Sequence, residues 1–264
     1  MELSPDETRV AVQKTDNGNA DLWMLESSRG IATRLTSNAA DEETPVWSPD
    51  GTRIAFDSNP KGPFDLYQMS IKDVGKESPF MESSETKTPN DWSADGRYFL
   101  FSVTHEKTGR DIWARPFFGA GTPFPVVERE FDQAVGSFSP DSRWIAYESN
   151  ESGRYEVYIQ PFPESGERLQ ISLDGGADPR WRADGKEVFY VAPDGTLMAA
   201  AVSVNAGNKQ IQAGKPTPLL RTLLGTGGRP PGYDVDRAGQ RFLIPTPVEK
   251  NIPPITILLN WAAR

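Results

Sequence analysis

A short phrase recurs six times along the chain, and it constrains the fold more than any other sequence feature. Its clearest copy is WSPDGTRIAF, which begins at Trp47. The six copies begin near Leu3, Trp47, Trp92, Phe138, Trp181 and Val235. Their starts are separated by 44, 45, 46, 43 and 54 residues, and self-similarity at such a period indicates a repeat architecture.

The phrase has the residues of a β-hairpin. In the second copy, Ser48, Pro49, Asp50 and Gly51 match the preferences of a type I turn, and a left-handed glycine lets the next strand leave antiparallel to the first. Residues typical of strands flank this turn on both sides. Glu7 and Ser142 stand where other copies have glycine, and a left-handed residue with a side chain costs about 1–2 kcal/mol.

Two further apolar segments complete each repeat. An acidic residue lies 18 or 19 positions after the start of four copies and opens a short apolar run, as in DLYQM from Asp65. A weaker apolar segment such as SPFMES then closes most copies. The sequence therefore predicts an all-β fold, a β-propeller of four-stranded antiparallel blades with six repeats, as one domain over residues 1–264. A β-sandwich is the weaker alternative, since it would not need a second motif at a fixed offset.

The recurring residues are expected to be structural. The acids Asp21, Asp65, Asp111 and Glu156 are predicted to accept hydrogen bonds from N–H groups of nearby turns. The aromatic residues at the starts of the phrases are predicted to be buried between blades at equivalent positions: Trp47, Trp92, Phe138 and Trp181.

Composition restricts the classes of partner. The chain has 28 Lys and Arg against 37 Asp and Glu, a net charge of −9, which disfavours nucleic acid and suits a cationic partner or simple solubility. It has no cysteine, no apolar run long enough to insert in a membrane, and no signal peptide at Met1. Because almost nothing precedes the first copy of the phrase, we expect the chain to be a segment of a longer protein.

No catalytic or metal motif is evident. The only histidine, His105, lies in the polar stretch THEKTGR and is predicted to be a solvated loop residue. No G-x-S-x-G, H-x-x-x-H or C-x-x-C pattern occurs, so we predict no catalytic residue, no metal ligand and no cofactor. The glycines of GTGGRPPG (225–232) are interpreted as a flexible connection rather than a phosphate-binding loop.

The loops that do not repeat are the predicted binding surface. Loops between the second and third strands, and between one blade and the next, are charged and differ in every repeat, as in SNPKGPF (58–64) and SNESGRY (149–155). Taken singly, each of their residues could be a solvated loop residue. The candidate ligand-binding residues are Glu42, Glu43, Asn90, Asp132, Asp178 and Arg180. Charge reversals among these acids are expected to weaken binding and leave stability nearly unchanged.

The repeats resemble the propeller repeats of the TolB family, whose phrasing is SPDG, then IAF, then D-[IL]-[YW]. More closely, the chain resembles the carboxy-terminal propeller of bacterial eukaryotic-like serine/threonine kinases of the acidobacterial type. That second resemblance lies in residues 20–36, 45–68, 108–119, 158–199 and 255–261. It implies a non-catalytic, extracytoplasmic (periplasmic) domain that senses or docks a ligand. None of the kinase signatures themselves is present.

Two hypotheses of function follow. The first is a binding module that docks a protein, a peptide or a small ligand on the loop face. The second is a lactonase-like hydrolase with a divalent ion held by carboxylates in the channel; its aligned positions Glu43, Asn90, Asp132 and Asp178 are irregular. We also expect the first and last repeats to close a six-bladed ring at a weak seam near Leu3 and Ile257, and the closed protein to be a monomer. The alternative is an open part of a seven-bladed ring whose missing blade lies upstream.

Overall fold

The computed structural model describes residues 1–118, 121–164, 166–205, 210–224, 232–246 and 257–258. These residues form strands, turns and connections only, as the sequence predicts for an all-β protein. Among them there is no helix of the length and apolar character that a membrane span requires. The chain divides into two compact units, Met1–Ala134 and Val135–Arg264. Each unit is described separately.

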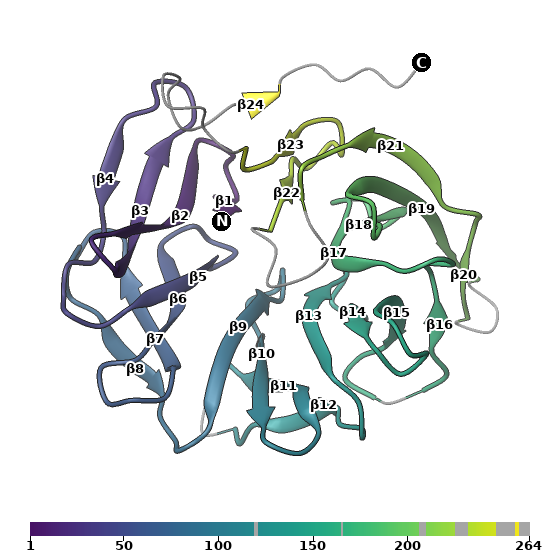
Figure 1. Ribbon diagram of the computed structural model, residues 1–264, viewed down its shortest axis with the longest axis horizontal. Helices are drawn as coiled ribbons and strands as arrows, with labels where there is room; N and C mark the ends of the chain where they lie inside the picture. Colours follow the sequence, from purple (N-terminus) through teal and green to yellow (C-terminus); the bar gives the residue numbers. More distant parts are fainter. Residues whose placement is uncertain (119–120, 165, 206–209, 225–231, 247–256, 259–264) are drawn as a thin grey trace. The chain divides into compact units, whose positions relative to one another are not determined.

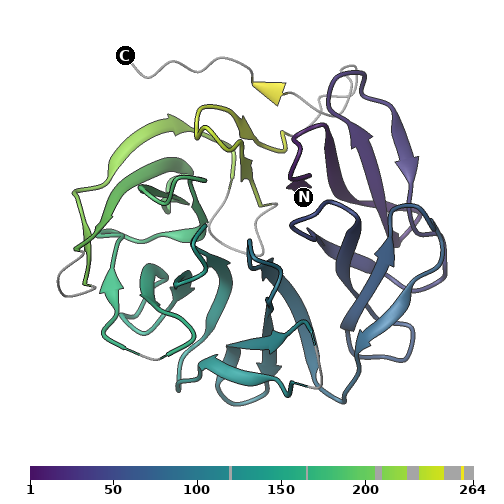
Figure 2. The same cartoon turned by 180° about the vertical axis from the view of Figure 1, so that it is seen from behind.

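Unit 1 contains three four-stranded antiparallel sheets, each with its strands in chain order (Figure 1). The first strands, β1, β5 and β9, and the fourth strands, β4, β8 and β12, form opposite edges of their sheets, as Figure 2 shows from behind. The bounds are β1 (Glu2–Leu3), β2 (Arg9–Asp16), β3 (Asn19–Glu26), β4 (Ala32–Arg34), β5 (Glu42–Trp47), β6 (Arg53–Ser58), β7 (Asp65–Ser70), β8 (Ser78–Met81), β9 (Thr86–Trp92), β10 (Tyr98–His105), β11 (Gly109–Pro116) and β12 (Phe124–Val127).

Unit 2 continues the pattern with changes toward its end, and the unit boundary falls inside β13. The bounds are β13 (Gln133–Phe138), β14 (Trp144–Ser149), β15 (Glu156–Pro161), β16 (Leu169–Gln170), β17 (Ala177–Trp181), β18 (Glu187–Val191), β19 (Thr196–Val204), β20 (Ile211–Ala213), β21 (Thr217–Arg221), β22 (Asp234–Val235), β23 (Phe242–Leu243) and β24 (Ile257–Leu258). The long strand β19 pairs with both β20 and β21, so this sheet has a fifth strand that the repeat did not predict.

The described residues thus form six sheets, one for each copy of the phrase. The last sheet has three short strands, β22, β23 and β24, and the first begins with a strand of two residues. The short first strand agrees with how little sequence precedes the first copy of the phrase. The expected seam involves residues 255–261, most of which lie outside the described residues, as do residues 225–231 of the predicted flexible connection. Ring closure and the single-domain prediction stay predictions.

The repeated phrase forms its turn through one serine and one aspartate. In the second sheet, Ser48 Oγ donates to Asp50 Oδ1 (2.6 Å) and accepts from the N–H of Arg53 (2.9 Å). The same bonds recur at Ser4, Ser93 and Ser139. Gly51 has φ 67°, and Glu7 and Ser142 adopt the same left-handed conformation at φ 58° and 57°. The strained turns are therefore where the sequence predicted them.

The aromatic residues that open the phrase are buried in every case. Trp47, Trp92, Phe138 and Trp181 are 3%, 6%, 5% and 9% exposed, which confirms their predicted equivalence. Within unit 1, Trp47 packs with Ala11 and Leu22 of the preceding sheet and with Ile54 and Phe56 of its own. Burial of these residues, at about 25 cal/mol per Å² of apolar surface, holds neighbouring sheets together.

Three of the four recurring acids accept hydrogen bonds from backbone N–H groups that follow the fourth strand. Asp65 accepts from Ser83 (3.2 Å), Asp111 from Arg129 (3.3 Å) and Glu156 from Gly175 (2.9 Å). Asp21 differs, because its Oδ2 accepts from Arg34 Nη2 at 2.6 Å instead. The structural interpretation of these acids is confirmed for the three, and the fourth has an ion pair in the same place.

Candidate functional site

The antiparallel order gives each sheet a turn end and a loop end. The turn end carries the hairpin between the first and second strands. The loop end carries the connection between the second and third strands and the connection from the preceding sheet. Each first strand begins at the loop end, and all six predicted ligand-binding residues lie in or directly before a first strand: β5, β9, β13 or β17.

Three first strands contain a left-handed residue that is not glycine. Thr44 in β5, Val135 in β13 and Asp178 in β17 have φ 42°, 51° and 56°. Each lies three residues before the buried aromatic residue of its strand, where β9 has Pro89. The pairing of β5 with β6 and of β17 with β18 shifts register here, which is the mark of a β-bulge. Nothing in the local sequence predicted this feature, because Thr, Val and Asp share no turn signal.

Glu42 and Glu43 are the first two residues of β5, and they differ in burial. Glu42 is fully buried, and Ser58 Oγ donates to its Oε1 at 3.2 Å. Burial raises the pKa of the Glu42 carboxyl, an effect opposed by hydrogen bonds from Thr36 and Asn38. Glu43 is half-buried at the same strand end. Of this pair, Glu43 is the one with a side chain that solvent reaches.

Asn90 and Asp132 are half-buried and already hold specific bonds within unit 1. Asn90 Oδ1 accepts from Ser102 Oγ at 2.9 Å. Asp132 accepts from Arg110 three times, from the backbone N (2.7 Å), from Nε (2.9 Å) and from Nη2 (2.6 Å). A side chain at Gly109 would lie 3.0 Å from Asp132, so the loop before β11 depends on that glycine. Asp132 thereby fixes the loop that leads into β11.

Asp178 and Arg180 form a pair on β17. Their Oδ1 and Nη2 atoms lie 3.1 Å apart, with Asp178 buried and Arg180 half-buried. The N–H of Asp178 donates to Glu148 Oε2 at 3.0 Å, which ties the bulge to the neighbouring sheet. Tyr233 is buried nearby, and burial followed by the charge of Asp178 raises its pKa well above the ordinary value. Arg180 is the one predicted cation of the site.

His105 is not the solvated loop residue that the sequence predicted. It is the last residue of β10 and is half-buried. Its Nε2 lies 3.4 Å from Asp111 Oδ2 and its Nδ1 lies 3.6 Å from Glu85 Oε1. The prediction was wrong because both acids come from neighbouring strands and connections, which THEKTGR by itself does not reveal. Burial raises the pKa of the Asp111 carboxyl beside it.

The predicted residues fall into two groups, one in each unit. Unit 1 holds Glu42, Glu43, Asn90 and Asp132, and unit 2 holds Asp178 and Arg180. In the described part of the chain, no group of three or more histidine, aspartate and glutamate side chains is placed to hold a metal ion. The exposed and half-buried atoms at these strand ends are carboxylate and amide oxygens with one guanidinium. Such groups can recognise a polar ligand through hydrogen bonds and charge, and this role stays a prediction.

The sequence is similar to known propeller proteins. Residues 2–115 match the family model described as TolB beta propeller domain. An uncharacterized protein of Agrobacterium fabrum is 28% identical over 207 residues, which cover 72% of this chain and 68% of that protein.

Solved structures agree on the fold. TolB from Acinetobacter baumannii superposes with a TM-score of 0.70 at 16% identity, over 93% of this chain and 59% of that one. A putative TolB from Agrobacterium tumefaciens gives 0.63 at 18% identity, over 80% and 78%. The chain thus spans about 59% of the Acinetobacter protein. The predicted fold class, an all-β propeller of TolB type, is confirmed.

Proposed function

We propose that this TolB-like β-propeller is a non-catalytic binding module whose ligand is a protein or peptide held at the loop ends of its sheets. The observation that carries the proposal is the left-handed residue in three first strands, at Thr44, Val135 and Asp178. Backbone strain of this kind costs about 1–3 kcal/mol per residue and concentrates at ligand sites. A bulge also changes the direction in which the neighbouring side chains point.

The side chains beside these bulges suit a peptide better than an apolar ligand. Glu43, Asn90 and Arg180 offer acceptors and donors of both charge signs on rigid strands. The net charge of −9 favours a ligand with cationic groups, since it raises the rate at which such a ligand encounters the protein. Variable loops on a repeated scaffold are the usual place for such recognition.

The absence of catalysis is part of the proposal. Several carboxylates that a metal-dependent hydrolase would need already have protein partners, as Asp132 has in Arg110 and Asp178 in Arg180. We therefore expect no turnover of lactones or of p-nitrophenyl esters, with or without Mn²⁺, Ca²⁺ or Zn²⁺. Metal-dependent hydrolysis that is abolished by EDTA would contradict this expectation.

We further propose an extracytoplasmic location and a role as the sensing domain of a membrane-anchored kinase. This proposal rests on the sequence resemblance alone. It is tested by tagging the gene at its own locus and treating spheroplasts with protease. Degradation of the tagged propeller in intact spheroplasts is expected, and full protection until lysis would reject the location.

The binding site is tested with a random-peptide phage library selected on the immobilised chain. Each peptide recovered from the wild type should lose binding to at least one of Glu43→Lys, in unit 1, and Arg180→Glu, in unit 2. Asp73→Lys is the matched control, since it reverses an exposed acid in the connection after β7. Glu42 and Asp178 are unsuitable for this purpose because they are buried, and a reversal there would destabilise the fold. From the sequence we expected charge reversal to leave stability nearly unchanged. Because Glu42 and Asp178 are buried, we now expect reversal at these two positions to lower stability.

Two results would contradict the proposed site. The first is a selection that recovers no peptide above background. The second is a set of peptides whose binding survives both reversals at the loop ends.

A further inference from the structure

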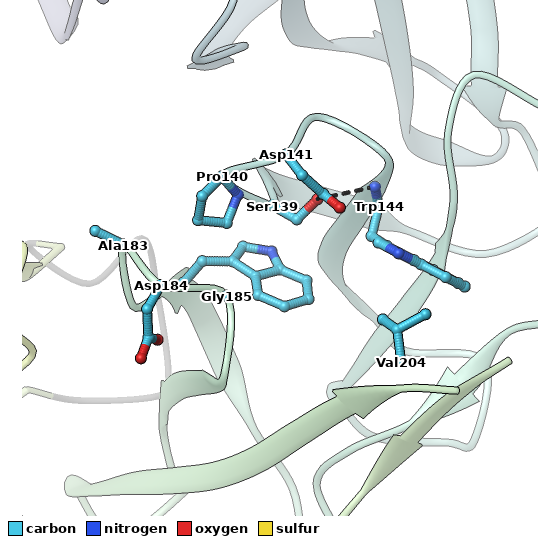
Figure 3. Close-up of a pocket in the computed structure, with 9 residues that line it drawn as sticks. Ser139, Pro140, Asp141, Trp144, Ala183, Asp184, Gly185 and Val204 are labelled. Atoms are coloured by element: carbon cyan, nitrogen blue, oxygen red, sulfur yellow. Dashed lines mark hydrogen bonds between the residues drawn. The ribbon is translucent and has the colours of Figure 1, made fainter. Parts of the chain in front are cut away.

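A cavity of about 360 Å³ lies in unit 2 at the turn ends of two neighbouring sheets (Figure 3). The β13–β14 turn contributes Ser139, Pro140 and Asp141, followed by Trp144 at the start of β14. The next sheet contributes Trp181, Ala183, Asp184 and Gly185, and β19 adds Val204. The cavity is therefore at the opposite end of the sheets from the proposed loop-end site, where the sequence suggested only repeated turns.

The corresponding junction in unit 1 lies between the first two sheets and has the same geometry. Trp47 Nε1 donates to the backbone oxygen of Glu2 at 3.2 Å, and Trp181 Nε1 donates to that of Ser137 at 3.2 Å. Glu2 and Ser137 each lie directly before the first residue of a copy of the phrase, three positions before its proline. The two tryptophans are thus equivalent in position and in bonding.

Glycines of the two junctions give the same correspondence. A Cβ at Gly51 would lie 3.6 Å from Pro5, and one at Gly185 would lie 3.8 Å from Pro140. The two turns of each junction therefore approach each other in the same way.

The junctions differ at the position that Arg9 has in the first phrase. In unit 1, the Arg9 guanidinium lies 5.0 Å from the centre of the Trp47 ring, and its Nη2 lies 3.6 Å from Asp6 Oδ2. In unit 2, Trp144 occupies the position of Arg9, while Asp141 and Trp181 keep the positions of Asp6 and Trp47. The acid and the aromatic ring are therefore present in unit 2 without the cation that accompanies them in unit 1.

Asp141 has only local partners. Its Oδ1 accepts from Ser139 Oγ at 2.6 Å and from the N–H of Arg143 at 3.2 Å. No cationic side chain of the described residues forms an ion pair with it, in contrast to Asp6. Asp184 on the other wall is paired with Arg182, whose hydrogen bond lowers the pKa of Asp184 to about 2, so this second carboxylate is ionised at every ordinary pH.

We propose that this cavity binds the side chain of an arginine presented by a peptide or protein partner. The guanidinium would lie in the cavity beside Trp144, with its charge toward Asp141 and its plane toward the indole rings. The aliphatic stem would pack against Val204, which is 48% exposed. Arginine suits the site better than lysine because a planar guanidinium both stacks on an aromatic ring and pairs with a carboxylate.

The proposal is tested by NMR titration of the ¹⁵N-labelled chain with the tripeptide N-acetyl-Gly-Arg-Gly-amide. The chain has seven tryptophans, and the indole signal of Trp144 is assigned with Trp144→Phe. We expect millimolar tripeptide to shift the Trp144 and Trp181 indole signals. The citrulline tripeptide, which has the same shape and no charge, should leave them in place. Equal shifts with citrulline, or no shift with arginine, would overturn the proposal.

Two variants separate the groups involved. Asp141→Asn should weaken tripeptide binding about two- to fivefold, the range of an exposed ion pair. Trp144→Arg should abolish it, because an internal arginine then fills the site as Arg9 does. Asp95→Asn, at the equivalent turn position of the third sheet, is the matched control and should bind as the wild type does.

The proposal can be tested even if Trp144→Arg does not fold. Unchanged binding of the tripeptide by Asp141→Asn would by itself reject it. The cavity is also independent of the loop-end site. Glu43→Lys should leave the tripeptide titration unchanged, so failure of either proposal is recognised separately.

Discussion

The junction of the first two sheets and the junction of the fourth and fifth sheets are built alike, and a cavity of about 360 Å³ lies at the second. Both place a tryptophan beneath the preceding turn, and both bond its indole N–H to a backbone oxygen. In the first, Arg9 covers the ring and pairs with Asp6; in the second, Trp144 stands in the same register. The comparison teaches that a change of residue within a repeat can decide whether the acid of a junction has a cationic partner in the protein itself.

The largest expected effect comes from removing the shared tryptophan. Trp47→Ala and Trp181→Ala should each lower the free energy of unfolding by about 3–5 kcal/mol. Trp47→Ala should cost more, because Arg9 then loses the ring that it covers. Urea denaturation measures both values. A greater loss for Trp181→Ala would contradict the expected contribution of Arg9.

Removing the cation of the first junction should have a smaller effect. Arg9→Ala should lower the free energy of unfolding by about 1 kcal/mol, the magnitude of a partly exposed cation–π contact. It should also let the arginine tripeptide shift the Trp47 indole signal, whereas we expect no such shift in the wild type. Arg53→Ala is the control, because Arg53 lies at the same position of the next sheet and bonds Gln68 at the surface. Equal effects of the two variants would remove the special role of Arg9.

The acid of the first junction gives a prediction for pH. Hydrogen bonds from the Ser4 hydroxyl and from the Thr8 N–H and hydroxyl, with a smaller contribution from Arg9, lower the pKa of Asp6 from 3.8 to about 2. A folded-state pKa below the unfolded one stabilises the fold above about pH 4, and this stabilisation is lost as the pH falls toward 2. Because the side chain is 56% exposed, the effect should stay below about 1 kcal/mol.

Urea midpoints measured between pH 2 and pH 7 test this prediction. Asp6→Asn should flatten the profile in the acidic window, whereas Arg9→Ala should change its slope little, since Arg9 is the smallest of the named causes. A profile of Asp6→Asn that falls as steeply as that of the wild type would assign the acid sensitivity to other groups.

The smallest expected effect is a coupling in the second junction. In the wild type, Asp141→Asn should change stability by less than about 0.5 kcal/mol, as surface substitutions usually do. In the Trp144→Arg background, the same change should cost a few tenths of a kcal/mol more, because Asp141 then has the partner that Asp6 has. Additive effects in the double-mutant cycle would mean that an arginine at this position does not reach the acid.

The candidate binding site was predicted only in part. The sequence identified the strand ends at which Glu43, Asn90 and Arg180 lie, because the alternation of strands fixes which connections share an end. It did not predict that Glu42 and Asp178 are buried, or that Asp132 is held by Arg110. Those partners come from other strands, and a single sequence gives no measure of such contacts.

The amino-acid sequence by itself determined the repeat, the hairpin turns and the burial of Trp47, Trp92, Phe138 and Trp181. These features depend on local chemistry: turn residues at fixed offsets, a serine and an aspartate that bond within five residues, and apolar runs of strand length. Only the tertiary structure decided the bulges in the first strands and the cavity beside Trp181. The bulges lie where a first strand shifts its register against the second strand of the same sheet. The cavity lies where residues such as Trp144 and Trp181, distant in the sequence, come together only after folding.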